Sequence, residues 1–286
     1  MRSYAGDVRA QVGNQVFRRV AGPDGPDRHE RIFESAGPRW FAEDRPIRRV
    51  HGDASMFVGG LRALLLQSLH PLAMAGVAGH SDYRHDPWGR LQRTSFFLAV
   101  TTFGPDAEAR RAVSRVRGVH RTVHGTAADG RPYAASDPHL LRWVHVAEVD
   151  SFLAAHRRYG SGPPLTAAER DGYVADTAVI AGKLGVLDPP TCEAGLVESL
   201  AAFRSELTGT EQARQAARYL LVRAPLPWPA WPAYAVLGGA AVGLLPGWAR
   251  RPLGLPHLPL LESTVGRVGG RAVTSAIRWA TSAPPT

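Results

Sequence analysis

The chain of 286 residues contains a single cysteine, Cys192, and a single lysine, Lys183. One cysteine cannot form an intramolecular disulfide or supply the thiolates of a zinc ribbon, which favours a reducing compartment. The 34 basic and 25 acidic residues give a formal net charge of +9. The arginines are scattered singly and in pairs without interleaved aromatic residues, and this pattern does not predict a nucleic-acid partner.

Long apolar runs are also missing. The most apolar stretch, residues 233–248, is closed by prolines at both ends and is shorter than the ~20 residues that a membrane-spanning helix needs. The N-terminal segment is amphipathic and lacks the apolar core of a signal peptide. We therefore expect a cytoplasmic protein in which residues 233–248 form a buried helix. A membrane-touching hairpin, and with it a peripheral membrane contact, is the alternative.

The common catalytic signatures are absent as well. The sequence has no Gly-x-Ser-x-Gly elbow, no phosphate loop and no dinucleotide fingerprint. His51, His70, His80 and His85 lie close together in sequence, but without the spacing of a zinc protease motif. The sequence therefore carries no signature of a hydrolase, a kinase or a dehydrogenase.

Strand signals are scarce, and helical signals dominate. Apolar positions recur every three or four residues, and no Asn-Gly or Asp-Gly pair lies between alternating apolar runs. We therefore predict an all-α protein with a single helical domain. Helices are predicted over residues 54–69, 87–102, 106–125, 138–159, 190–208 and 210–223, and a further helix is predicted to begin after the capping box of Thr166 and Glu169.

The predicted domain boundaries follow composition. Residues 1–35 are expected to form a loosely structured N-terminal arm, residues 36–250 the helical domain and residues 251–286 a C-terminal extension. The region from residue 224 onward is rich in proline and tryptophan. We expect this region to wrap around the helices.

The segment 106–125 predicts an amphipathic helix with a histidine inside its apolar stripe. On a helical wheel, Val119 and His120 fall within about 60° of Val116, while arginines occupy the opposite side. His124 lies at the edge of the stripe. A buried histidine usually hydrogen-bonds a carbonyl in the core. The alternative is a ligand to iron or zinc, because neutral imidazole is a common metal donor.

The segment 138–159 places His145 and Glu148 on one helical face, together with Leu141 and Phe152. The pair could orient an imidazole or relay a proton. It could equally be an ordinary helix pair worth a few tenths of a kcal/mol. A di-iron bundle needs Glu-x-x-His twice and two further inward glutamates, and the sequence does not supply them.

Arg90, Arg93, Thr94 and Phe97 share one face of the helix predicted over residues 87–102. If this face is buried, the two guanidinium groups are buried without a carboxylate on the same helix. An anionic group from elsewhere must then pair with them. The alternative is an arginine edge that faces solvent. The candidate partners are Asp53, Asp82, Glu148, the carboxylates of a cofactor and a bound oxygen species.

Three ordered segments resemble the catalytic domain of the rubber-oxygenase family, which includes the latex clearing protein and MpaB-like oxygenases. The resemblance covers roughly residues 38–250 and rests on HGDASMFVGGLRALLLQSLHPLAMAGVAGHSDYRHDPWGRLQRT, VRGVHRTVHG and DPHLLRWVHVAEVDSFL. It implies a globin-like helical core around heme b, and an enzyme that uses dioxygen. With one cysteine, covalent heme attachment through Cys-x-x-Cys-His is impossible, so histidine would hold the heme noncovalently.

The resemblance also implies roles for single residues. The VR-x-x-H-x-x-V pattern places the proximal, iron-binding ligand at His120, with His124 as the alternative and His145 as a further cofactor-binding candidate. The family's Arg-x-x-Lys-Thr motif on the distal side matches Arg90 and the two residues three and four positions later.

An arginine, Arg93, replaces the lysine of that motif, and Thr94 follows it. Because arginine does not release its proton, we do not expect this side chain to ligate iron. Arg90, Arg93 and Thr94 are then expected to hydrogen-bond a bound oxygen species or the heme propionates. Arg90 thus counts both as a catalytic and as a cofactor-binding candidate.

The distal acid of the rubber-cleaving members has no clear counterpart, since its position falls near Met74. Together with the missing signal peptide, this favours a small apolar unsaturated substrate, such as a prenyl chain or another lipid tail, over polyisoprene. The alternatives are a noncatalytic heme-binding or gas-sensing protein, a lipid- or partner-binding helical protein without cofactor, and a membrane-surface protein.

Overall fold

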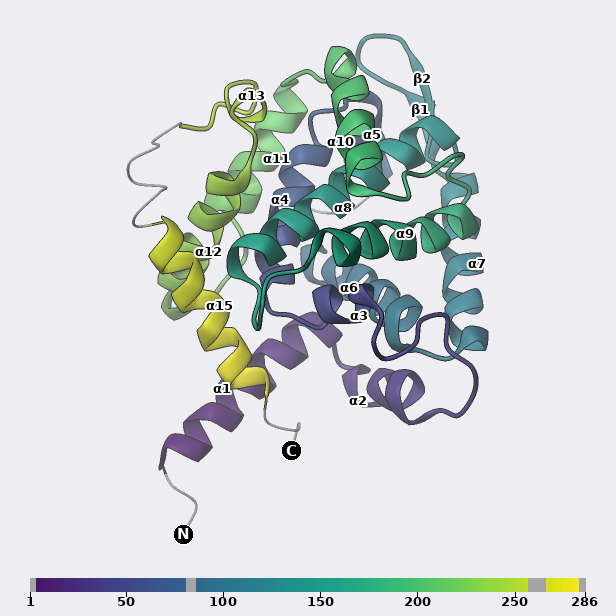
Figure 1. Ribbon diagram of the computed structural model, residues 1–286. Coiled ribbons are helices and arrows are strands. Elements are labelled where there is room, and N and C mark those ends of the chain that lie inside the picture. The colour runs from purple at the N-terminus through teal and green to yellow at the C-terminus, as the bar shows by residue number, and fades with distance from the viewer. Residues whose placement is uncertain (1–3, 81–85, 257–265, 283–286) are drawn as a thin grey trace.

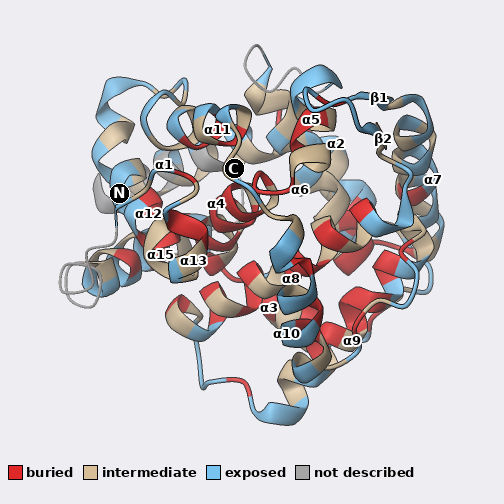
Figure 2. Cartoon of the chain, turned by 90° about the horizontal axis from the view of Figure 1, so that it is seen from above, coloured by how far each residue is buried: buried red, intermediate tan, exposed pale blue. Residues whose placement is uncertain are grey.

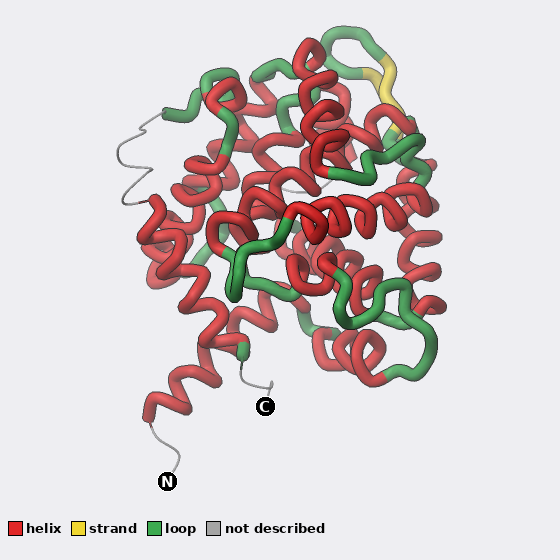
Figure 3. The backbone as a smooth tube through the Cα atoms, in the orientation of Figure 1, coloured by secondary structure: helices red, strands yellow, loops and turns green. Residues whose placement is uncertain are grey.

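The computed structural model describes residues 4–80, 86–256 and 266–282 (Figure 1). Helices make up most of these residues, and the strands among them form one short hairpin (Figure 3). This confirms the prediction of an all-α protein. A globin-like arrangement of the helices and the domain boundaries at residues 35 and 250 stay predictions.

The helices of the N-terminal half come first along the chain. They are α1 (Tyr4–Ala21), α2 (Gly25–His29), η1 (Glu30–Glu34), α3 (Pro46–His51), α4 (Ser55–Gln67), α5 (Pro71–His80), α6 (Pro87–Phe103) and α7 (Asp106–Thr122). The hairpin of β1 and β2 follows. The remaining elements are β1 (His124–Thr126), β2 (Pro132–Ala134), α8 (Pro138–Tyr159), α9 (Ala167–Leu184), α10 (Glu193–Ala202), η2 (Phe203–Glu206), α11 (Glu211–Val222), η3 (Trp228–Ala230), α12 (Trp231–Leu244), α13 (Gly247–Arg250) and α15 (Arg267–Thr281).

Capping side chains set the starts of three long helices where the sequence predicts them. Asp86 accepts a hydrogen bond from the amide of Gly89, and Asp137 accepts one from the amide two residues later, each directly before a proline in the first turn. Thr166 and Glu169 form a complete capping box at the start of α9. These side chains satisfy amides that have no partner inside the helix.

The predictions at the end of α7 were wrong. The helix ends at Thr122 rather than at residue 125, and β1 pairs antiparallel with β2. Ala128 and Asp129 form the turn, Gly130 follows it with the left-handed φ of +84°, and the amide of Ala127 donates to the carbonyl of Arg131. The strands have three residues each and lack apolar alternation, so the sequence pattern did not reveal them.

The two ends of the chain are more helical than predicted. The N-terminal arm, expected to be loosely structured, forms α1 and α2, and α1 packs against α6 and α15. At the C-terminal end, α12 packs against α4 and α15, which confirms the helix predicted for the most apolar stretch, residues 233–248. Residues 231–244 form one helix with a buried side around Leu237 and Ala241, and not a hairpin.

No single helix among the described residues is long and apolar enough to cross a membrane. The pair α4 and α5 passes that test only when taken together, by length and composition, and it is bent by 106° at the break between the two helices.

The core is built around α4 and α8, which pack side by side over several turns and carry many of the buried residues (Figure 2). Gly59 lies against Phe152, because a Cβ atom at position 59 would come within 2.8 Å of the Phe152 ring and 3.1 Å of its Cα. Three residues further along α4, Arg62 is only 3% exposed. Its guanidinium lies 2.7 Å from Asp150 and donates to the hydroxyl of Ser151 (2.6 Å). Because Gly59 has no side chain, the backbones of α4 and α8 approach closely at Phe152. Arg62 joins the same two helices through Asp150 and Ser151.

The substitution Gly59→Ala should destabilise the protein by about 1 to 2 kcal/mol, because overpacking outweighs the helix propensity that alanine gains over glycine. Gly60→Ala is the matched control, since a Cβ at Gly60 would lie 4.0 Å from Phe152. This control should be neutral or stabilising. Urea unfolding of both variants checks the prediction, and equal effects at the two positions would contradict it.

Candidate functional site

The first part of the candidate site is the hairpin of α6 and α7. Only Gly104 and Pro105 separate the two helices, which pack against each other (Figure 1). Arg90 lies near the start of α6 and His120 near the end of α7.

His120 lies in the last turn of α7, on the side that carries the buried Ala109 and Val113. Its ring is half-buried, and its Nδ1 atom is buried without a hydrogen-bond partner among the described residues. Burial lowers the pKa of His120, so the imidazole is neutral at pH 7 and can donate a lone pair. Val119 is 55% exposed, so the prediction that placed it inside the stripe was wrong.

His124 has a different environment from His120. It lies on β1 and is exposed, and its backbone carbonyl accepts a hydrogen bond from Nε2 of His80 (3.0 Å). The structure thus places one candidate ligand in a partly enclosed position and the other at the surface.

The two polar residues predicted on one face of α8 are both half-buried. Burial, together with the charge of Arg142, lowers the pKa of His145 to about 4, and its Nε2 atom is buried without a partner in the described part of the chain. Burial raises the pKa of Glu148 to about 7. Near neutral pH, His145 is therefore uncharged, and Glu148 is close to its titration midpoint.

A hydrogen-bonded group from three other helices lies beside Glu148. Nδ1 of His51 (α3) lies 2.8 Å from the hydroxyl of Thr102 (α6), and its Nε2 lies 3.3 Å from the hydroxyl of Tyr173 (α9). Burial raises the pKa of Tyr173 well above 10, and the charge of Glu148 raises it further. Burial lowers the pKa of His51 to about 3.

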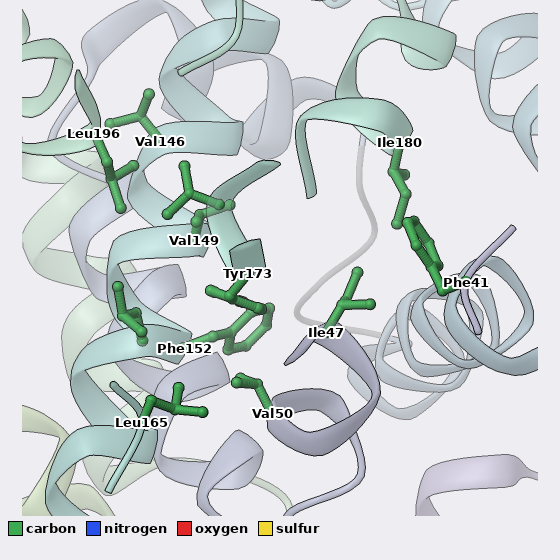
Figure 4. Packing of buried hydrophobic residues seen from close by; sticks show 12 residues of the cluster. Phe41, Ile47, Val50, Val146, Val149, Phe152, Leu165, Tyr173, Ile180 and Leu196 are labelled. Atoms are coloured by element: carbon green, nitrogen blue, oxygen red, sulfur yellow. The ribbon is translucent and has the colours of Figure 1, made fainter. Parts of the chain in front are cut away.

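Apolar side chains surround this group. Tyr173 belongs to a buried cluster with Phe152, Ile47 and Val50 (Figure 4). The ring of His51 contacts both Tyr173 and Phe152 edge-on. Sequence reasoning named His51 and Glu148 but missed Thr102 and Tyr173, because these partners lie 51 and 122 residues away from His51 and share no motif with it.

The polar face of α6 is largely exposed to solvent, not buried. The side chain of Arg93 is 66% exposed and pairs with Asp86 at 3.2 Å, and Thr94 is exposed. Arg90 is half-buried, while Phe97, one turn after Thr94, packs against the buried cluster around Tyr173. Arg93 and Thr94 therefore correspond to the solvent-facing alternative.

Two of the carboxylates considered as partners for Arg90 and Arg93 are Asp53 and Asp82. Asp53 binds Arg278 of α15 at 2.9 Å and the hydroxyl of Ser161 at 2.7 Å. Burial raises the pKa of Asp53, but these hydrogen bonds outweigh it and hold the pKa below its usual range. The expectation that Asp53 meets Arg90 or Arg93 has no support, and Asp82 lies outside the described residues.

Comparison with known protein families matches residues 48–279 to the catalytic domain described as "ER-bound oxygenase mpaB/B'/Rubber oxygenase, catalytic domain". The chain belongs to this family. The match confirms the resemblance seen in the sequence and extends beyond residue 250, into α15. The roles of His120, Arg90, Arg93 and Thr94 within this rubber-oxygenase family domain stay predictions.

Two curated relatives of this rubber-oxygenase family chain are uncharacterised proteins of mycobacteria. They are Mb2261 of Mycobacterium bovis and Rv2237 of Mycobacterium tuberculosis, each 34% identical over 95 residues, which are 33% of this chain and 36% of the relative. The matching segment thus spans about a third of these relatives. No solved structure matches the chain.

The environment of Glu148 predicts a pH effect on stability. The unfolded carboxyl titrates near 4.5 and the folded one near 7, so between these values the folded chain holds a proton that the unfolded chain has lost. The stability of the parent relative to Glu148→Gln should therefore fall as pH rises through this window, by at most about 3 kcal/mol.

Chemical denaturation of both proteins at several pH values measures this difference. The parent is compared with Glu148→Gln because other groups also make stability depend on pH. The lowered pKa values of His51 and His145 destabilise the fold as pH falls below 6.5, which is opposite to the effect of Glu148. The exposed Glu198→Gln controls for the general effect of removing a carboxylate. A difference that does not change with pH would show that Glu148 is not protonated near neutral pH.

Proposed function

We propose that this protein is a heme b-dependent oxygenase that acts with dioxygen on a small apolar unsaturated substrate, such as a prenyl or lipid chain. The environment of His120 carries the proposal. The chain belongs to an oxygenase family. The imidazole of His120 is neutral and half-buried, and its Nδ1 atom is buried without a partner among the described residues. A neutral imidazole with a free lone pair could bind the heme iron, so His120 would be the residue that holds the group.

When bound, heme b supplies the iron at which dioxygen is activated. The overall reaction would cleave one carbon–carbon double bond with one dioxygen molecule and give two carbonyl groups. The protein's own contribution is to bind the heme, to orient the substrate and to stabilise charge as it develops. The residues available for these tasks lie on α6, α7 and α8.

Arg90, Arg93 and Thr94 are the proposed donors on the distal side. Their N–H and O–H groups can donate hydrogen bonds to a negatively charged oxygen or to a propionate. Arg93 is available for this role because its exposed ion pair with Asp86 is worth less than about 1 kcal/mol. The match of these three residues to the family's Arg-x-x-Lys-Thr pattern, with Arg93 in place of the lysine, supports the assignment.

Glu148 is the proposed proton carrier. With a pKa near 7, its carboxyl group can hold a proton and release it within the physiological pH range. The hydroxyl of Tyr173 cannot do so, because burial raises its pKa well above 10. Tyr173 would instead keep its proton and maintain the hydrogen bond to His51.

Protein produced with a heme precursor should show a Soret band that His120→Ala removes. His124→Ala should keep the band, because the His124 side chain is exposed on β1. Absorption spectra of the parent and the two variants at equal concentration measure this, with circular dichroism to confirm that each variant is helical.

Each other spectroscopic outcome rejects a part of the proposal. A band that disappears only in His124→Ala moves the ligand to β1. A six-coordinate ferric spectrum that changes in His145→Ala favours the gas-sensing alternative. A parent that stays colourless after heme supplementation rejects heme dependence.

Arg93→Ala and Thr94→Ala should each weaken dioxygen binding by the reduced, heme-loaded protein roughly tenfold or more. The first removes a charged hydrogen-bond donor and the second a neutral hydroxyl donor. Unfolding stability should change by less than about 0.5 kcal/mol, since both side chains are exposed. Arg115→Ala, which removes an exposed arginine from α7, is the matched control. Equal oxygen affinities in all three variants would rule out the distal role.

A further inference from the structure

A second cluster of donors lies apart from the His120 candidate site, where three segments meet. His70 follows the end of α4 and directly precedes α5, His139 is in the first turn of α8, and Glu206 is the last residue of η2. Both imidazoles direct Nε2 at the same carboxylate. Nε2 of His139 lies 2.9 and 3.0 Å from its two oxygens, and Nε2 of His70 lies 3.4 Å from one of them.

The three segments are held together independently of these side chains. The amide of Thr208 donates to the carbonyl of Leu69 at 2.8 Å, which joins the end of η2 to the bend between α4 and α5. The side-chain amide of Gln67 donates to the carbonyl of Val144, and the indole of Trp143 donates to the carbonyl of Gln67. The donors therefore sit on a fixed backbone frame, which lowers the entropy cost of binding a ligand.

The surroundings of the cluster are apolar on one side and open on the other. The ring of Phe203 stacks against His139 with centroids 4.8 Å apart, and Trp143 and Phe203 both contact His70. His70 is only 1% exposed, whereas His139 is exposed. An ion could therefore enter beside His139 and retain a coordination position toward solvent.

The donor set suits a transition metal. Two imidazole nitrogens and a carboxylate are ligands that zinc takes in proteins.

Hydrogen bonding alone leaves the buried histidine poorly satisfied. The distance of 3.4 Å to Glu206 is long for a hydrogen bond, and Nδ1 of His70 is buried without a partner in the described parts of the chain. Burying an imidazole with so few partners is costly. A bond from Nε2 to a metal ion would replace the long contact with Glu206, and Nδ1 would then carry the ring proton.

We propose that His70, His139 and Glu206 bind one divalent transition-metal ion, with Zn²⁺ as the preferred ion. One ligand atom from each residue lies within 4.8 Å of the others, so small rotations bring all three to the ~2.0–2.2 Å that zinc requires. Two nitrogen donors disfavour Ca²⁺ and Mg²⁺, which take oxygen ligands. Arg131 lies nearby, but Asp129 binds its guanidinium at 2.7 Å and offsets its charge.

The bound ion would cross-link the start of α5, the start of α8 and the end of η2. Because α5 packs against α8, α11 and the β1–β2 hairpin, the ion would fix this helix through the residue that directly precedes it. The site is proposed independently of heme binding, and its test does not depend on enzyme activity.

The test is a zinc titration of the full-length, tag-free protein after treatment with a chelator, monitored by competition with a zinc-binding dye. We expect one ion per chain and a thermal midpoint that rises by several degrees with zinc. His139→Ala and Glu206→Gln should each weaken binding by more than about 100-fold, since loss of a direct ligand exceeds the loss typical of outer-shell partners. His29→Ala, which removes a histidine from α2, should bind zinc as the parent does.

Substitution with Co²⁺ gives a second readout, because its visible spectrum should report tetrahedral coordination and change in Glu206→Gln. His139 is exposed, so His139→Ala should fold, and His139→Gln replaces it if circular dichroism shows otherwise. Absence of zinc binding in the micromolar range, or binding that both variants retain, would overturn the proposal. An unchanged Soret band in His139→Ala separates this site from the proposed heme.

Discussion

The close packing of α4 along α8 is the constraint on which the rest of the structure depends. Gly59 lets the two backbones meet at Phe152, and Arg62 fixes the same pair through Asp150 and Ser151. Once α8 is held in this way, its turns present different functional side chains. Its middle turns present His145 and Glu148, while its first turn presents His139 to the bend that ends α4.

The interior contains two kinds of polar group, and their partners distinguish them. Arg62 and Asp53 are buried as charges, and each has an oppositely charged partner together with further hydrogen bonds. His51, His145 and Glu148 have no such partner among the described residues, and burial shifts their pKa values toward the neutral form. The first kind stabilises the fold. The second kind costs stability and is typical of a site that binds or transforms a ligand.

Local signals in the sequence predicted a large part of the fold. Capping residues located the starts of α6, α8 and α9, and the wheel placed His120 on the inner side of α7. The wheel could not decide whether Arg93 faces inward, because exposure depends on which neighbour covers α6. The contacts of Asp53 with Arg278, and of His51 with Tyr173, join residues 225 and 122 apart and follow only from the tertiary packing.

The ion pair between Asp53 and Arg278 also has a consequence for the order in which the molecule assembles. Arg278 binds Asp53 directly before α4 and the carbonyl of Tyr159 at the end of α8, so the last helix closes the central pair. During synthesis, Asp53 leaves the ribosome more than two hundred residues before its partner. Asp53 cannot form this ion pair until residue 278 has been made, and closing so long a loop of chain carries a large entropy cost.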